Sequence, residues 1–431
     1  MHSAEPPPTR RRSTSLTRGP RWPSKPFVAL GLTLLTALSG SAKTSAAPDR
    51  LEGVRSVLVL RRDEPLFTGP NKGAARRGAA ERNARLPVFE LTRGGGCSGR
   101  WFLVGPLAWI CEEGVEASAA DAPPEQPRQA SAEGLPYDYY FVGPDGSFGY
   151  TDLMVAEDGV PETQLLPGFG VAITREGQKP GGERYGLSTH GFWIPLRDLR
   201  RAAAPSFRGS AVGDALDVAW VKLDKTHARK TPGGAALKGL LPRQARLQVL
   251  ETSEASGKKW LRVGDGQWLP AAEVVQPTRL ARPTEVKAGE RWFDVELATQ
   301  VLTAYVGDHP VFATLVSTGR GPEGTVLATP PGLHRIWVKL AASDMDNLEN
   351  LEANEAYAIQ AVPWVMYFQK GYGLHGTFWH RAFGRVQSHG CVNLSPADAE
   401  RLFNFASPRL PSGWTAALPT VYEQGSLVRV R

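Results

Sequence analysis

The residues best suited to chemistry are one cysteine and two histidines that lie close together near the C-terminus. The sequence reads Tyr372-Gly373-Leu374-His375-Gly376, continues for eleven residues, and then reads Ser388-His389-Gly390-Cys391-Val392-Asn393. A free thiol with a pKa of about 8.5 is mostly protonated at neutral pH, and the thiolate is the nucleophile. Because a nearby imidazole can take the thiol proton, these residue types predict nucleophilic catalysis by Cys391.

Glycines accompany each of these reactive residues. Gly376 follows His375, and Gly390 directly precedes Cys391. Glycine permits close backbone approach and positive φ angles, and backbone N–H groups in such a turn can form an oxyanion hole. The pattern therefore indicates a site for amide cleavage or acyl transfer, and it leaves the substrate open.

Two other interpretations of the same residues compete with catalysis. One is a zinc site, with four potential ligands in His375, His380, His389 and Cys391. Their spacing lacks the paired close ligands at both ends that are typical of zinc sites. The other is a buried structural cysteine among core histidines, which the dense clustering of Gly, His and Cys disfavours.

The motif resembles the catalytic domain of the L,D-transpeptidase (YkuD) family. The signature of that family is His-Gly, a spacer, then Ser or Thr, His, Gly, Cys, an apolar residue, and Arg or Asn. The segments 329–332 and 363–368 also look like that family. The resemblance covers residues 289–431 and implies a β-rich catalytic domain with short helices.

The resemblance implies a role for each residue of the motif. Cys391 is expected to be the nucleophile and His375 the base, with the Gly376 carbonyl orienting the imidazole through its other nitrogen. His389 is expected on the oxyanion side of the site. His389 is not excluded as a base by its position alone, because side chains at i and i+2 of an extended turn can share one face.

Further residues are expected to support the loop or to contact substrate. Ser388 and Gly390 are expected to shape the oxyanion side, and Tyr367 and Tyr372 to bind substrate. Asn393 stands where many family members carry Arg, which bears on how the carboxylates of the substrate are held.

The reaction implied is peptidoglycan L,D-transpeptidation through a Cys391 acyl-enzyme, without cofactor or metal. Terminal D-Ala leaves a stem peptide, and an amine of a neighbouring stem resolves the intermediate into a 3→3 cross-link. Stem peptides and carbapenem-type inhibitors are the expected partners. The alternatives are an enzyme that attaches proteins to peptidoglycan, or detaches them, by the same acyl-enzyme, and a non-catalytic wall-binding protein.

The N-terminal residues 1–47 have the order of a signal peptide and short leader. Basic residues end at Lys25, an apolar stretch covers 27–38, and small residues follow. The apolar stretch is short for a membrane span, so we expect export to the periplasm or cell wall with no transmembrane span after signal removal. The alternative is an uncleaved N-terminal anchor. Of the net charge of +7, about +5 lies before residue 43, so the charge gives little support for nucleic-acid binding.

The chain contains three cysteines, Cys97, Cys111 and Cys391. In an oxidising compartment the first two can pair and leave one odd thiol. A β-hairpin between Phe102 and Ala108 would bring the pair together. Parity therefore also points to Cys391 as the functional thiol.

Three segments before the C-terminal domain share a faint repeat of aromatic residues. Trp101 is followed by Trp109, and Trp260 by Trp268, at a spacing of eight in both cases, and Tyr185 by Trp193. The pattern resembles bacterial SH3-like domains. We therefore expect a mainly β chain: a first segment (52–113), a linker (114–136), a possible middle segment (137–200) and a third segment (212–275), each segment a small SH3-like barrel.

Two helices are predicted near the reactive residues. Ser395-Pro396 has the residue types of an N-cap followed by proline at the first helical position, with apolar residues at helical spacing after it. The acidic stretch 341–356 is predicted to form a helix or lid between strands.

Overall fold

The computed structural model describes residues 53–348 and 357–431. The predicted signal peptide and leader lie outside the described residues. The described chain is mainly β, as predicted, with a single α-helix. None of the described helices has the length and apolar character needed to cross a membrane.

The first segment is built from short antiparallel strands around a core that includes Leu66, Phe102 and Ile110. Strands β4, β1 and β8 form one small sheet, and β3, β2, β7, β6 and β5 run in order within a larger one. Their bounds are β1 Ser56–Val59, β2 Glu64–Phe67, β3 Arg76–Ala80, β4 Arg85–Pro87, β5 Glu90–Thr92, β6 Trp101–Gly105, β7 Ala108–Cys111, 3-10 helix η1 Glu112–Gly114 and β8 Val115–Ser118.

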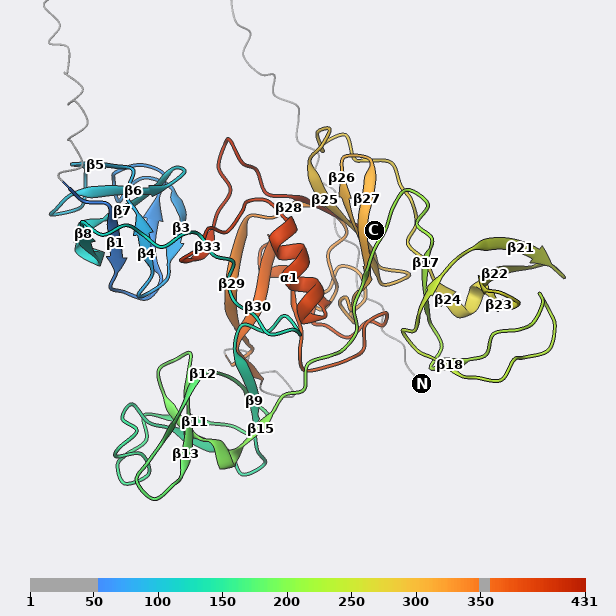
Figure 1. The fold of residues 1–431 in the computed structure, drawn as a ribbon, viewed down its shortest axis with the longest axis horizontal. Coiled ribbons are helices and arrows are strands. Elements are labelled where there is room, and N and C mark those ends of the chain that lie inside the picture. The colour runs from blue at the N-terminus through green and yellow to red at the C-terminus, as the bar shows by residue number, and fades with distance from the viewer. Residues whose placement is uncertain (1–52, 349–356) are drawn as a thin grey trace, which may run out of the picture. The chain divides into compact units, whose positions relative to one another are not determined.

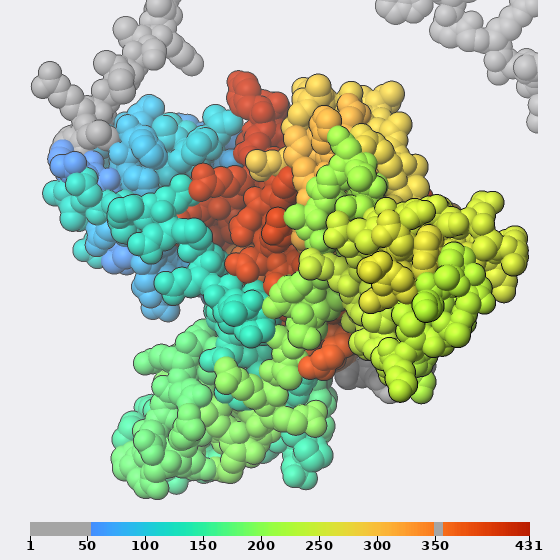
Figure 2. Space-filling model, turned by 45° about the vertical axis from the view of Figure 1, so that its right-hand side comes forward, coloured from blue at the N-terminus to red at the C-terminus, as the bar shows by residue number. Residues whose placement is uncertain are grey.

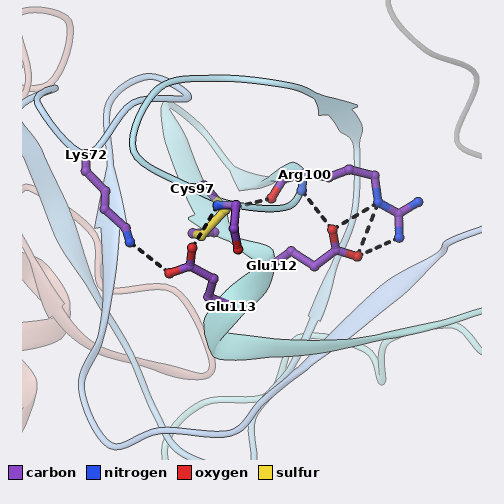
Figure 3. The surroundings of a disulfide bond; sticks show 7 residues. Lys72, Cys97, Arg100, Glu112 and Glu113 are labelled. Carbon is purple, nitrogen blue, oxygen red and sulfur yellow. Dashed lines mark hydrogen bonds and ion pairs between the residues drawn. A yellow bond between two sulfur atoms is a disulfide. The ribbon is translucent and has the colours of Figure 1, made fainter.

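Cys97 and Cys111 form a disulfide in the first segment (Figure 3). The hairpin β6–β7 pairs Trp101 with Cys111, so it brings Cys111 next to the loop that carries Cys97. Acidic residues after the bridge fasten the same loop: Glu113 accepts a hydrogen bond from the Ser98 N–H at 2.7 Å and also binds Lys72, and Glu112 accepts hydrogen bonds from Arg100. The disulfide and these ion pairs tie the Cys97 loop to the hairpin.

We expect thiol counting on the denatured protein to find one free thiol of the three cysteines. The bridge closes a loop with a sequence separation of 14, which the chain-entropy model values at about 3 kcal/mol of unfolding free energy. Double replacement of Cys97 and Cys111 by alanine should lower the free energy of unfolding by about 3 kcal/mol, as measured by urea unfolding. Three titratable thiols in the parent would refute the pairing.

The middle segment contains eight further elements around Val171, Ile173 and Ile194. Strands β9, β12, β13 and β14 are antiparallel neighbours, and β15 pairs with β9. Their bounds are β9 Asp138–Val142, β10 Ser147–Gly149, β11 Thr163–Leu165, β12 Gly170–Gln178, β13 Arg184–Ser188, β14 Trp193–Pro195, 3-10 helix η2 Leu196–Asp198 and β15 Leu199–Arg201.

The third segment has small two- and three-stranded sheets, with Trp220, Leu261 and Leu269 buried. Its elements, with the preceding strand β16, are β16 Ser210–Ala211, β17 Val218–Val221, β18 Lys225–Thr226, β19 Leu241–Pro242, β20 Arg246–Gln248, β21 Glu251–Ala255, β22 Lys258–Gly264, β23 Gln267–Pro270, 3-10 helix η3 Ala271–Glu273 and β24 Val274–Val275.

The faint sequence repeat corresponds to a shared structural ending. In all three segments a strand that carries the second aromatic residue of the repeat (Trp109, Trp193 or Trp268) leads into a 3-10 turn and then a short strand. The first two of these tryptophans are buried and the third is partly buried. The assignment of the segments to SH3-like domains stays a prediction.

The C-terminal domain consists of two sheets and the helix α1. One sheet has the order β16-β27-β26-β25-β34-β28, and the other contains the run β31-β30-β29-β33 with β32 beside β31. The bounds are β25 Arg291–Glu296, β26 Val301–Val306, β27 His309–Leu315, β28 Gly332–Arg335, β29 Val338–Asp346, β30 Ala358–Gln369, β31 Tyr372–Gly376, β32 Val392–Leu394, α1 Pro396–Phe405, β33 Trp414–Ala417 and β34 Leu427–Val430.

Helix α1 begins as the sequence predicts and lies along β30 (Figure 1). Ser395 is the N-cap and accepts a hydrogen bond from the Asp398 N–H, and Pro396 occupies the first turn, where its missing N–H costs nothing. The buried face of α1 includes Leu402 and Phe403, which belong to the same core as β26, β30, β31 and β32. The helix therefore supports the strands that carry the reactive residues.

Strand β33 joins the C-terminal domain to the first segment. It pairs with β29 on one side and with β3 on the other. Trp414 of β33 is buried in the core of the first segment. In the space-filling view the red C-terminal residues lie against the blue and cyan first segment (Figure 2).

Two expected boundaries differ from the structure. The helix predicted over 341–356 is wrong for residues 341–346, because β29 continues to Asp346, and residues 349–356 lie outside the described chain. The stretch 114–136, expected as a linker, contains β8, and its Ala130 packs against the core of the C-terminal domain. No periodic pattern in the sequence marks the Ala130 contact, because a single residue makes it.

Lys339 on β29 is buried at the C-terminal end of α1. Its ammonium donates hydrogen bonds to the carbonyls of Phe403 and Ala406 and lies 4.3 Å from the centre of the Phe403 ring. Burial lowers the pKa of Lys339 to about 7. The lysine therefore stabilises the end of the helix but carries a desolvation cost whenever it is charged.

We expect the unfolding free energy to include a contribution from Lys339 that rises with pH. Between about 7 and the ordinary value of 10.5 the unfolded chain binds the lysine proton and the folded chain releases it, so stability increases with pH in that window. Urea unfolding from pH 7 to 10 should show a smaller rise for Lys339→Met than for the parent. The exposed Lys258→Met is the control; equal slopes in all three proteins would contradict the prediction.

Candidate active site

Neighbouring strands place the two halves of the motif side by side. Strands β31 and β32 are parallel partners, with His375 opposite Asn393, and Cys391 stands directly before β32. Gly390 has a φ of +120°, and a Cβ there would lie 2.4 Å from the ring of Tyr372. Glycine is required at this position, because any larger residue would displace the loop that carries the nucleophile.

Cys391 is the free cysteine of the described chain and is partly exposed. Its Sγ lies 3.7 Å from the Gly371 carbonyl, to which the thiol donates. Burial raises the pKa of the Cys391 thiol, and the Gly373 N–H opposes that shift by hydrogen bonding to the sulfur. The resting sulfur is therefore a thiol rather than a thiolate at neutral pH.

His375 is buried and held in one tautomer. Its Nδ1 lies 3.2 Å from the Gly376 carbonyl oxygen and 3.4 Å from the Thr377 hydroxyl. A carbonyl only accepts, so Nδ1 carries the proton and Nε2 keeps its lone pair. Burial lowers the pKa of His375 to about 4. The imidazole is therefore neutral and able to accept a proton through Nε2.

His389 is held in the opposite way by a residue outside the motif. The guanidinium of Arg320 lies 2.8 Å from Nε2 of His389. A guanidinium only donates, so Nε2 of His389 accepts and the ring proton is on Nδ1. Burial and the Arg320 charge lower the pKa of His389. In His389 the ring atom left free is therefore the Nδ1–H, which is a donor. In His375 the free ring atom is Nε2, which has a lone pair.

Hydrogen bonds within the loop 388–391 identify which backbone groups are free. The Ser388 hydroxyl accepts from the Gly390 N–H at 3.0 Å and donates to the Cys391 carbonyl. Thr329 donates to the Gly390 carbonyl at 2.7 Å. The Cys391 N–H has no hydrogen-bond partner within 53–348 and 357–431. Ser388 and Gly390 therefore support the loop, and the Cys391 N–H is the group available to an oxyanion.

Asn393 is engaged with His380 rather than with an open surface. The Asn393 side-chain amide lies 2.9 Å from Nε2 of His380, and the Ala382 N–H donates to Nδ1 of the same ring. Burial lowers the pKa of His380 to about 4, so the ring is neutral and Nε2 carries its proton. The amide nitrogen of Asn393 is the atom that faces Nε2, and turning the amide over by 180° brings its oxygen, which has no partner among the described residues, to accept that proton. Through this contact Asn393 holds the loop that carries His380, so its side chain supports the site from behind.

The two tyrosines expected to bind substrate lie on either side of the turn before His375. Tyr372 donates its hydroxyl hydrogen to the Val326 carbonyl at 3.1 Å. Burial raises the pKa of Tyr367, and Cys391 adds to that shift. The Tyr367 ring stacks on Trp337 with 5.9 Å between centres, and Trp337 is 47% exposed. Both tyrosines therefore line the surroundings of the nucleophile.

The four potential zinc ligands do not form a cluster. In the part of the chain that the structure describes, the group with metal-binding spacing is Cys97, Cys111 and Glu113, and its two sulfurs form the disulfide. His375 and His389 each use one ring nitrogen in the contacts with Gly376 and Arg320. The geometry favours separate roles for the histidines over shared coordination.

Several residues of the site carry no signal in the sequence. Arg320, Thr329 and Tyr357 reach the motif from segments that are 30 to 70 positions away. Arg320 follows a strand end with no motif around it, and the contact depends on the parallel bridge between Gly319 and Ser388. Such residues are identified by the fold alone.

We expect the reactivity of Cys391 to reflect a neutral thiol beside a neutral imidazole. Alkylation by iodoacetamide should keep rising through pH 8 and 9, because burial raises the pKa of the Cys391 thiol above its ordinary value. Acylation that uses His375 as base should stay level with falling pH and decrease only near pH 4, where His375 is protonated. A plateau of alkylation near pH 6 would indicate a resting thiolate–imidazolium pair and contradict this expectation.

The comparisons with solved structures return L,D-transpeptidases. A crystal structure of an Enterococcus faecium L,D-transpeptidase mutant is 20% identical, covering 34% of this chain and 50% of that chain at a TM-score of 0.25. An L,D-transpeptidase from Stackebrandtia nassauensis is 25% identical, covering 34% and 58% at a TM-score of 0.23. One from Mycobacterium smegmatis is 16% identical, covering 53% and 94% at a TM-score of 0.27.

The chain thus spans about half the length of the Enterococcus faecium structure. A comparison with curated proteins finds no match to this chain. A family model does match: the L,D-transpeptidase catalytic domain, YkuD, over residues 290–424. These residues include the strands and loops that carry the site described above. Residues 290–424 therefore belong to the YkuD family of L,D-transpeptidase catalytic domains.

Proposed function

We propose that this protein is a peptidoglycan L,D-transpeptidase that forms 3→3 cross-links through a Cys391 acyl-enzyme. The observation that carries the proposal is the tautomer of His375. Its Nδ1 donates to the Gly376 carbonyl, so Nε2 is free to take the thiol proton. The family match over residues 290–424 gives the class of reaction.

The proposed reaction starts from the neutral pair. Sγ of Cys391 attacks the carbonyl of the third stem residue while Nε2 of His375 takes the thiol proton. The Cys391 N–H donates to the oxyanion. The tetrahedral intermediate expels terminal D-Ala, whose amine receives the proton from His375. An amine of a neighbouring stem then attacks the thioester, its proton passes to His375, and the thiol is restored; attack by water gives carboxypeptidation.

The free lone pair of His375, on the strand that pairs with the one directly after Cys391, also bears on the alternatives. A degenerate, non-catalytic wall-binding protein has no need of a fixed imidazole tautomer and a glycine at φ +120° before the cysteine. An enzyme that attaches proteins to peptidoglycan, or detaches them, would use the same acyl-enzyme and differ in the acceptor. The acceptor is therefore the point that an experiment must identify.

The setting of the proposed reaction is outside the cytoplasm. Peptidoglycan stem peptides are the proposed partners, and carbapenems are the proposed covalent inhibitors. The periplasm or cell wall follows from this substrate and from the expected export signal in residues 1–47. The first, middle and third segments are proposed to be SH3-like domains.

The experiment is incubation of the purified protein with muropeptides followed by mass spectrometry. We expect dimers joined through a 3→3 link, with release of one D-Ala per link. Products that lack one D-Ala without dimers would identify carboxypeptidation. Recovery of unchanged muropeptides, by a protein that nevertheless binds them, would support the non-catalytic alternative and overturn the proposal.

A further inference from the structure

Strand β30 contains a strained bulge at Ala361. The register between β29 and β30 shifts so that Gln360 and Ala361 lie opposite the single residue Asp344. Ala361 has a φ of +48°, a left-handed conformation that is unfavourable for a residue with a Cβ. Such a conformation persists where the surrounding structure holds it. A bulge of this kind bends a strand and redirects its end.

The middle segment supplies groups that hold the bulge. Tyr139 on β9 is 2% exposed, and its hydroxyl donates to the Ala361 carbonyl at 2.6 Å. The Ala361 N–H donates to Asp344 at 2.7 Å. His190, on the turn between β13 and β14, lies 2.7 Å from the other oxygen of Asp344. Both backbone groups of Ala361 are thus bound by side chains that the middle segment provides or fixes.

The residues just before Ala361 are held by the same segment. Gly170 of β12 forms a parallel bridge with Ile359, and a Cβ on Gly170 would lie 3.0 Å from the Ile359 side chain. The Ala172 N–H donates to the Gln360 side chain at 3.4 Å. Residues 359–361 are therefore contacted from β9, β12 and the His190 turn.

The start of β30 leads directly to the nucleophile loop. Tyr357, the residue before β30, stacks on His389 with 5.5 Å between ring centres and 16° between planes. Its N–H donates to the Asn347 side chain at 2.7 Å. Burial raises the pKa of Tyr357, and Cys391 adds to the shift, which reflects their proximity. The bulge at Ala361 thus sets the direction of the four residues that carry Tyr357 to His389.

We propose that the middle segment is a clamp that holds Tyr357 against His389 through the bulge at Ala361. Tyr139, Asp344 and His190 are then positioning residues for acylation of Cys391, and two of them lie outside the catalytic domain. Only the predicted effect of the clamp on acylation rests on the proposed function. Its effect on the backbone at residues 357–361 is independent of what the site catalyses.

Full-length Tyr139→Phe and His190→Ala test the clamp, with Tyr140→Phe as the matched control. Tyr140 is the neighbour of Tyr139 on β9, where it pairs with Val171 of β12 and packs against the core of the middle segment. We expect Tyr139→Phe to lower the rate of carbapenem acylation about tenfold, as loss of one buried hydrogen bond predicts. His190→Ala should lower the rate less, because the hydrogen bond between His190 and Asp344 is exposed. Alkylation by iodoacetamide should stay at the parent rate, because the thiol itself is unchanged.

Hydrogen exchange separates the clamp from the proposed function. The amides of residues 357–361 should exchange about tenfold faster in Tyr139→Phe and His190→Ala, and at the parent rate in Tyr140→Phe. Unchanged exchange in both clamp variants, or equal losses of acylation and alkylation, would overturn the clamp. Faster exchange in both clamp variants, together with a parent protein that never reacts with carbapenem, would retain the clamp and reject the transpeptidase.

Discussion

Cys391→Ala should abolish the carbapenem adduct and all cross-linking while leaving the fold intact. The thiol donates one long hydrogen bond, to the Gly371 carbonyl at 3.7 Å, so its loss costs the fold little. In the proposed reaction the sulfur of Cys391 forms the acyl-enzyme, and alanine has no group that can replace it. Intact-protein mass spectrometry after incubation with carbapenem measures the adduct, and circular dichroism checks the fold.

The matched control for Cys391→Ala is the double variant Cys97→Ala/Cys111→Ala. It leaves Cys391 as the single cysteine of the chain, so its adduct must be on that residue. We expect this control to form the adduct at a rate close to the parent rate, since the disulfide belongs to the first segment. An adduct that persists in Cys391→Ala would place the nucleophile elsewhere.

Much of the site was predictable because its residues are close in sequence or have a local geometric signature. His375 and Cys391 lie on strands that are direct neighbours, so a short spacer is enough to bring them together. Ser395-Pro396 starts a helix because capping depends on residues within one turn. The Gly376 carbonyl follows His375 directly, and contact between them needs no other element.

The rest depends on contacts that no local pattern encodes. Arg320 meets His389 because Gly319 bridges Ser388, a pairing across 69 positions. The bulge at Ala361 needs Asp344 on the next strand and Tyr139 from another segment. The acidic composition of 341–346 favoured a helix, but pairing with β30 keeps these residues in a strand. Long-range pairing overrides local preference in these places.

The pKa shifts also change the chemistry expected from the sequence. The motif predicts that His375 makes a thiolate near neutral pH. Burial raises the pKa of Cys391 and lowers that of His375 to about 4, so both shifts oppose a resting ion pair. In the proposed reaction, proton transfer therefore accompanies attack on the carbonyl, and His375 acts as a general base within that step.

His375→Ala should lower the rate of carbapenem acylation about 10³-fold near neutral pH, the contribution typical of a general base. The variant keeps the thiol, so its acylation should depend on the thiolate fraction and rise about tenfold per pH unit up to the raised thiol pKa. The parent should show no such slope, because neutral His375 takes the proton at any pH above about 4. The measurement is the acylation rate against pH.

His389→Ala is the matched comparison. His389 belongs to the same motif as His375, but its Nε2 is bound to Arg320. Without a lone pair free, His389 supplies support or a donor, and one donor at an oxyanion is worth roughly 3 kcal/mol, or about 10²-fold. Its pH profile should keep the level shape of the parent, at a lower rate. If His389→Ala acquires the slope and His375→Ala stays level, His389 is the base, and the tautomers that Gly376 and Arg320 impose do not decide the roles.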